Sequence, residues 1–196
     1  MYRTSRTLIA SFIVVALLVP SAVLARDVPA PVPPDDAELA FVIDVIDGDT
    51  IRVDRDGGSA ERVRYIGIDT PEIAHQPSET DEPWGPEATD VNEDLVRDRL
   101  VLLERDVSDT DRYDRLLRYV WVETEGGWVM VNGELVARGL AEVHAYEPDT
   151  RHHDWFSQLR QEAIDGGEGM YGDRPEAEDD AAENLLESIL DLIGWD

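Results

Sequence analysis

Apolar and β-branched residues concentrate in three stretches in the first part of the chain's central region. These stretches are residues 40–46, 50–53 and 62–68. Such short apolar runs are typical of β-strands, and in residues 62–68 the apolar positions also alternate with polar ones. Asp56-Gly57-Gly58, between the second and third stretches, is typical of a hairpin turn. The pattern therefore predicts an antiparallel meander at the start of the fold.

The rest of the central region alternates between helical and extended patterns. A helix opened by Pro86 is expected first, followed by strands at residues 100–104 and 116–122. Two more helices are predicted at residues 129–138 and 154–164. Three strands, a helix and two strands is the order of a five-stranded Greek-key barrel of the oligonucleotide-binding (OB) type. The predicted fold class is a β-barrel with about three packed α-helices, an α+β architecture.

The two ends of the chain differ from its centre. Residues 1–25 join two arginines, an apolar run and a small-residue cleavage site, which predicts a signal peptide or, as the alternative, a membrane anchor through residues 8–24. Residues 26–38 are proline-rich and indicate a linker. The pattern of residues 173–196 predicts an acidic tail with an amphipathic C-terminal helix, which is expected either to pack on the barrel or to form an appendage. The protein is expected to be secreted, or anchored facing outwards.

The charge of the chain is strongly negative. It carries 44 acidic against 17 basic residues, a formal net charge of −27, and every basic residue is an arginine. Such a charge repels itself in dilute buffer, whereas at molar salt the Debye length falls to about 3 Å and screens the repulsion. The composition therefore predicts a halophilic acidic protein. The absence of cysteine excludes disulfides and thiolate metal sites.

Five short motifs follow one another along the central region. They are Val45–Thr50, Arg64 with Asp69–Glu72, Trp84–Ala88, Asp111–Arg115 and Met130–Ala141. In this order and spacing they resemble the staphylococcal nuclease (thermonuclease) family, and the likeness runs from about Ala40 to Gly172. The resemblance implies a nuclease-like OB-fold domain over residues 39–172. It also implies a Ca²⁺-dependent endonuclease, a hydrolase acting on the phosphodiester bonds of DNA and/or RNA.

Two carboxylates are expected to form the centre of a metal site. Asp49 precedes the second predicted strand and Asp69 follows the third, so they can face one another in an antiparallel barrel. Carboxylates held close together repel unless a cation lies between them, and oxygen ligands favour Ca²⁺. By the resemblance, Asp49 and Asp69 bind Ca²⁺ through their carboxylates and Thr70 through its backbone carbonyl.

The resemblance also assigns the groups that act on the substrate. Glu72 is expected to be the general base that takes a proton from the attacking water. Arg64 and Arg115 are expected to bind the phosphate, because a guanidinium suits bidentate contact with phosphate oxygens. Tyr113 and Arg112 are expected to contact the substrate.

Some features depart from the family pattern. Asp114 stands where the family usually has glycine, next to Arg115. The loop of residues 73–83 also carries acids where a polyanion would approach. One alternative is therefore a catalytically weak or inactive OB-fold module that binds nucleic acid or protein; another is an acidic surface protein that only binds Ca²⁺. We expect a monomer without a stable protein partner.

Overall fold

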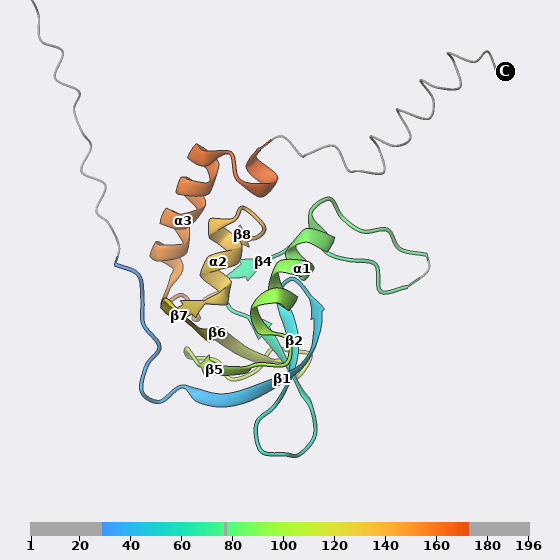
Figure 1. Cartoon of the computed structure of the whole chain (residues 1–196), viewed down its shortest axis with the longest axis vertical. Coiled ribbons are helices and arrows are strands. Elements are labelled where there is room, and N and C mark those ends of the chain that lie inside the picture. The colour runs from blue at the N-terminus through green and yellow to red at the C-terminus, as the bar shows by residue number, and fades with distance from the viewer. Residues whose placement is uncertain (1–28, 77, 173–196) are drawn as a thin grey trace, which may run out of the picture.

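The computed structural model describes residues 29–76 and 78–172, and the predicted signal peptide or anchor and the acidic tail lie outside the described residues. The elements follow in the order β1 (Glu38–Asp47), β2 (Thr50–Asp54), β3 (Glu61–Tyr65), β4 (Ile68–Asp69), α1 (Gly85–Val96), β5 (Leu100–Glu104), β6 (Leu116–Thr124), β7 (Gly127–Met130), α2 (Val131–Ala137), β8 (Glu142–Val143) and α3 (His153–Gly166). A 3₁₀ turn at Gly169–Tyr171 ends the described chain (Figure 1).

The main sheet closes on itself. Its strands lie in the order β3-β2-β1-β5-β6-β7, and β3 also pairs with β6. The closing pair is parallel, with Val63 opposite Leu116, whereas the other pairs are antiparallel. Strands β1, β2, β3, β5 and β6 thus form a closed barrel without free edges among them. The predicted five-stranded barrel with three helices is confirmed.

Strand β1 changes its inward-facing positions along its length. Ala40 and Val42 are buried at its start, whereas Val45 and Asp47 are buried at its end. The switch from even to odd positions coincides with a register shift between Val42 and Asp44 in the pairing with β2. A β-bulge inserts one residue and re-aims the side chains that follow it. A second register shift lies between Val45 and Asp47, so the buried Asp47 follows two irregularities in the pairing of β1 with β2.

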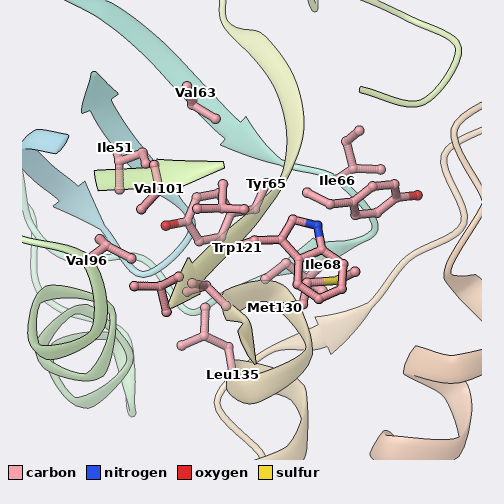
Figure 2. Close-up of a cluster of buried hydrophobic side chains, with 14 of the residues drawn as sticks. Ile51, Val63, Tyr65, Ile66, Ile68, Val96, Val101, Trp121, Met130 and Leu135 are labelled. Atoms are coloured by element: carbon pink, nitrogen blue, oxygen red, sulfur yellow. The ribbon is translucent and has the colours of Figure 1, made fainter. Parts of the chain in front are cut away.

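The core fills the barrel and continues under the helices. Figure 2 shows its centre, where Trp121 lies among aliphatic side chains from the strands and Leu135 from α2. Trp121 is 1% exposed and Leu135 is fully buried. Helix α1 contacts β1, and α2 lies against both the barrel strand β6 and α3. None of the helices within the described ranges has the length and apolar composition that crossing a bilayer requires.

The helix expected at residues 129–138 begins two residues later in the structure than predicted. Val129 and Met130 belong to β7, which pairs with β6, and α2 starts only at Val131. A strand of four residues that leads directly into a helix leaves no turn signal in the sequence. The helix expected at 154–164 is confirmed and extends by a few residues, to Gly166.

The strand expected at residues 62–68 is interrupted. It splits into β3 and the short β4, which pairs with β8 outside the barrel. Gly67 lies between them with φ of 80°, a left-handed conformation that breaks the extended chain. The break moves Asp69 off the line of β3 and brings it to the same end of the barrel as the β1–β2 turn.

Candidate active site

The turn between β1 and β2 carries two carboxylates held by local hydrogen bonds. The backbone N–H of Asp49 donates to Oδ1 of Asp47 at 3.1 Å, and the hydroxyl of Thr50 donates to Oδ1 of Asp49 at 3.1 Å. Gly48, between the two carboxylates, is closely covered, since a Cβ there would lie 2.6 Å from Oγ1 of Thr70. Only glycine fits this contact, so the turn packs directly against the segment that follows β4.

Arg64 joins the two predicted metal ligands. It lies on β3 opposite Thr50, and its guanidinium forms ion pairs with both Asp49 and Asp69. The backbone N–H of Thr70 donates to Oδ2 of Asp49 at 3.0 Å. The side chain of Asp49 is buried, whereas that of Asp69 is 46% exposed. The structure therefore brings Asp49, Asp69, Thr70 and Arg64 together.

This cluster has an excess of negative charge. Asp47, Asp49, Asp69 and Glu72 contribute four carboxylates against the single guanidinium of Arg64. Burial, helped by the charge of the neighbouring Asp47, raises the pKa of Asp49 to about 7, although the attraction of Arg64 lowers it. Burial also raises the pKa of Glu72, with a further increase from Asp47. A hard divalent cation would balance this charge, and the all-oxygen donor set around Asp49 and Asp69 fits Ca²⁺.

Glu72 lies at the rim of the cluster, at the start of the loop between β4 and α1. Its backbone carbonyl accepts a hydrogen bond from the N–H of Glu82 at 2.9 Å, and its own N–H donates to Oε2 of Glu82 at 3.1 Å. A Cβ at Gly85 would lie 2.5 Å from that same carbonyl oxygen. The loop is thus closed at its base against the start of α1, with Glu72 in a defined place.

Two members of the neighbourhood were not predicted as site residues. Asp47 and His75 present ligand atoms that lie, together with one from Glu72, within 4.8 Å of one another. Asp47 shares the Asp-Gly-Asp turn with Asp49, which is a signal that the sequence carries. His75 lies in an irregular loop, and no periodicity or motif marks it.

A cleft of about 520 Å³ lies next to the acidic cluster. Its lining includes the side chains expected to bind phosphate and substrate, namely Arg64, Arg112, Tyr113 and Arg115. The loop after β8 contributes Tyr146 and Glu147, which the sequence did not single out. Tyr113 and Tyr146 are 54% and 51% exposed, which is high for aromatic rings. The cleft therefore combines guanidinium groups with accessible aromatic faces.

Asp111 organises the loop that presents Arg115. Its Oδ1 accepts the backbone N–H groups of Tyr113 and Arg115 at 2.8 and 3.0 Å, and its Oδ2 accepts Nε of Arg115 at 2.7 Å. The guanidinium carbons of Arg112 and Arg115 lie 4.7 and 5.6 Å from the centre of the Tyr113 ring. Asp114 has φ of 59°, a conformation that favours glycine. The turn thus orients Arg115 at the cost of strain at Asp114.

Comparison with known proteins places this site in a family. The family model described as staphylococcal nuclease homologue matches residues 62–173. Thermonuclease of Staphylococcus hyicus is 40% identical over 122 residues, which are 62% of this chain and 69% of that protein. Endonuclease YncB of Bacillus subtilis is 41% identical over 120 residues, which are 60% of this chain and 54% of that protein. The chain belongs to the staphylococcal nuclease family.

Proposed function

We propose that this protein is a secreted, Ca²⁺-dependent nuclease that hydrolyses phosphodiester bonds of DNA and/or RNA. Its relatives named thermonuclease and endonuclease support the nuclease activity. The observation that carries the proposal is the placement of Arg64 between a carboxylate cluster and a cleft that also contains Arg115. A cluster that binds a cation beside a phosphate-binding cleft is what phosphodiester hydrolysis requires.

The metal site would consist of Asp49, Asp69 and the backbone carbonyl of Thr70. Ca²⁺ bound there would neutralise charge on the phosphate and on the attacking water. Asp49 must be ionised to take part, and burial, which raises its pKa, opposes that state, so a bound cation would stabilise the ionised form. The pairing with Arg64 keeps both carboxylates in place.

Glu72 would act as the general base. Glu72 is an exposed residue at the rim of the cluster, where a water molecule could reach both its carboxylate and a bound phosphate. Partial desolvation of the carboxylate and the charge of Asp47 raise the pKa of Glu72. A base is more effective when its pKa lies closer to the working pH, so the raised value favours proton transfer from water.

Arg64 and Arg115 would bind the scissile phosphate from two directions. The Nε–H of Arg115 donates a hydrogen bond to Asp111, so the orientation of the Arg115 guanidinium is fixed before the substrate arrives. Tyr113 and Tyr146 offer exposed rings on which nucleobases can stack, and Arg112 adds positive charge to the same cleft. These contacts suit either nucleic acid, because stacking and phosphate binding do not depend on the sugar.

Export is the second part of the proposal. It is supported by the composition of residues 1–25, in which Arg3 and Arg6 precede an apolar run. The N-terminus of protein recovered from the culture medium, read by mass spectrometry, tests it. A new N-terminus near residue 26 is expected, whereas an intact residue 1 on membrane-bound protein would indicate an anchor.

The metal requirement can be tested by cleavage of single-stranded DNA and RNA in molar salt, with Ca²⁺, with Mg²⁺ or with chelator. Cleavage is expected with Ca²⁺ and not with chelator. Asp69→Asn should remove the response to Ca²⁺, whereas Asp44→Asn, a surface change on β1, should keep it. Binding of DNA without cleavage under every condition would instead favour the inactive binding module.

A further inference from the structure

A second group of metal-binding side chains lies beside the proposed Ca²⁺ site. We propose that Asp47, Glu72 and His75 bind a divalent transition-metal ion of the zinc class, and that this ion inhibits the nuclease by occupying Glu72. The inhibition rests on the proposed function, in which Glu72 is the general base. The binding does not depend on it and is measured separately below.

The three side chains converge from two elements. Their ligand atoms lie within 4.8 Å of one another, and Nε2 of His75 lies 3.9 Å from Oδ2 of Asp47. Asp47 comes from the end of β1, whereas Glu72 and His75 come from the loop after β4. Zinc bonds of about 2.0–2.2 Å require ligand atoms closer than this, so the site must contract by about 1 Å. Glu72 and His75 are exposed and can make that movement.

Asp47 is already directed at this group. It is 8% exposed and follows the second register shift of β1, between Val45 and Asp47. Its Oδ1 accepts the backbone N–H of Asp49, which fixes the carboxylate and leaves Oδ2 facing His75. A buried carboxylate oxygen that faces an imidazole and a second carboxylate is a ready metal ligand.

The loop holds the backbone of His75 and leaves its ring accessible. The N–H of His75 donates to Oε2 of Glu79 at 3.0 Å, and the N–H of Ala74 donates to Oδ1 of Asp81 at 2.7 Å. The side chain of His75 nevertheless remains 47% exposed. In Figure 1 this loop projects from the body of the molecule at the start of α1. The acids that would repel a polyanion here thus also shape the loop.

The donor set separates the two sites by metal preference. Asp49, Asp69 and the Thr70 carbonyl supply only oxygen, which suits Ca²⁺. Asp47, Glu72 and His75 supply two carboxylates and an imidazole nitrogen, which suits Zn²⁺ and its neighbours in the transition series far better than Ca²⁺. Excess Ca²⁺ should therefore not displace zinc from the second site. A Glu72 carboxylate bound to zinc cannot accept a proton from water, so cleavage stops.

The binding test titrates ZnCl₂ into the protein at saturating Ca²⁺ and measures the heat released. We expect one tight site in the wild type. His75→Gln should weaken zinc binding by at least about tenfold. Substitutions of residues that support metal ligands lower metal affinity by about 10- to 100-fold, and tenfold is the lower end of that range. His144→Gln, which changes another exposed histidine outside the cluster, should bind like the wild type. Equal zinc binding by wild type and His75→Gln would overturn the site.

The inhibition test measures Ca²⁺-supported cleavage against zinc concentration, with each variant normalised to its own zinc-free rate. His75→Gln should raise the inhibitory zinc concentration by the same factor by which it weakens binding. Zinc that binds through His75 but leaves cleavage unchanged would overturn the inhibition. Failure of the nuclease itself would appear as no cleavage in zinc-free Ca²⁺, and the binding titration would still decide the site.

Discussion

The side-chain amide of Asn92 donates a hydrogen bond to the backbone carbonyl of Asp47 at 2.9 Å. The side-chain oxygen of Asn92 accepts a hydrogen bond from the hydroxyl of Tyr65 at 2.8 Å, and Asn92 is completely buried. Helix α1 therefore holds the turn that carries Asp47 and Asp49. We infer that Asn92 is a positioning residue for the proposed metal site.

Replacing Asn92 with alanine should both destabilise the protein and weaken Ca²⁺ binding. The change leaves the carbonyl of Asp47 and the hydroxyl of Tyr65 buried without this partner, which costs about 2–3 kcal/mol of unfolding free energy. Denaturant unfolding and Ca²⁺ titration measure the two effects. Asp90→Ala, an exposed change on the same helix, is the control and should alter stability by less than about 0.5 kcal/mol. Equal behaviour of the two variants would contradict the role of Asn92.

Asp114→Gly should stabilise the protein and raise its activity. The left-handed conformation costs an ordinary residue about 1–2 kcal/mol, part of which glycine loses again through its greater flexibility, so a net gain of about 0.5–1 kcal/mol is expected. Removing the charge next to Arg115 should raise kcat/KM for DNA by up to about fivefold.

Asp98→Gly is the matched control for Asp114→Gly. Asp98 has φ of 57° in the loop after α1, outside the cleft. The Asp98→Gly variant should gain about as much unfolding free energy as Asp114→Gly, whereas its kcat/KM for DNA should stay at the wild-type value. If both variants altered cleavage equally, the charge of Asp114 would have no specific effect on the site.

Glu104 should make stability depend on acid pH. Burial alone would raise its pKa, but hydrogen bonds from His152, Arg151 and Trp121 hold the pKa below its ordinary value. A lowered folded pKa means that the stabilisation is present above the unfolded value of about 4.3 and is lost as pH falls through the folded value. Glu104→Gln should thus cost about 2–4 kcal/mol at pH 7 and less as pH falls towards 3.

Chemical unfolding of Glu104→Gln and wild type at both pH values checks this sign. Glu125→Gln, in the exposed β6–β7 turn, should match the wild type throughout. A Glu104→Gln deficit that stayed constant from pH 7 to pH 3 would show that the loss does not depend on the ionisation of Glu104.

Salt should stabilise the protein and leave its activity intact. The net charge of −27 repels itself at low ionic strength and is screened within about 3 Å in molar salt. The melting temperature is expected to rise between 0.1 and 2 M KCl, and DNA cleavage to persist or increase. Sucrose at matched osmolality separates screening from general exclusion effects. A steep, monotonic loss of rate from dilute to molar salt would count against salt adaptation.

Local patterns in the sequence predicted most of the barrel. The strand at residues 100–104 has its observed bounds, and the hairpin between β2 and β3 lies where Gly57 predicts it. Strand β7 was missed because four residues without a turn before α2 carry no distinct period. The register shifts in β1 were missed because nearly every position of residues 40–46 is apolar, and only the pairing with β2 reveals the shifts.

A motif in the sequence named several residues of the candidate site. Asp49, Asp69 and Arg64 lie together in the structure and Arg115 lines the adjoining cleft, whereas their roles in binding and catalysis stay predictions. Contacts between distant segments could not be read from local pattern. Tyr146 reaches the cleft only because the loop after β8 folds back beside the loop of Tyr113, and Asn92 reaches the turn only through the packing of α1.

The most direct test of the proposed mechanism is the rate of single-stranded DNA cleavage by wild type and Glu72→Gln, in molar salt with Ca²⁺. The wild type should cut only when Ca²⁺ is present, and Glu72→Gln should lose about 10²–10⁴-fold in rate while Ca²⁺ titration still shows binding. Glu125→Gln, changed in the distant β6–β7 turn, should cut like the wild type. Wild-type rates from Glu72→Gln, or a folded wild type that cuts nothing at any salt or metal concentration, would contradict this mechanism.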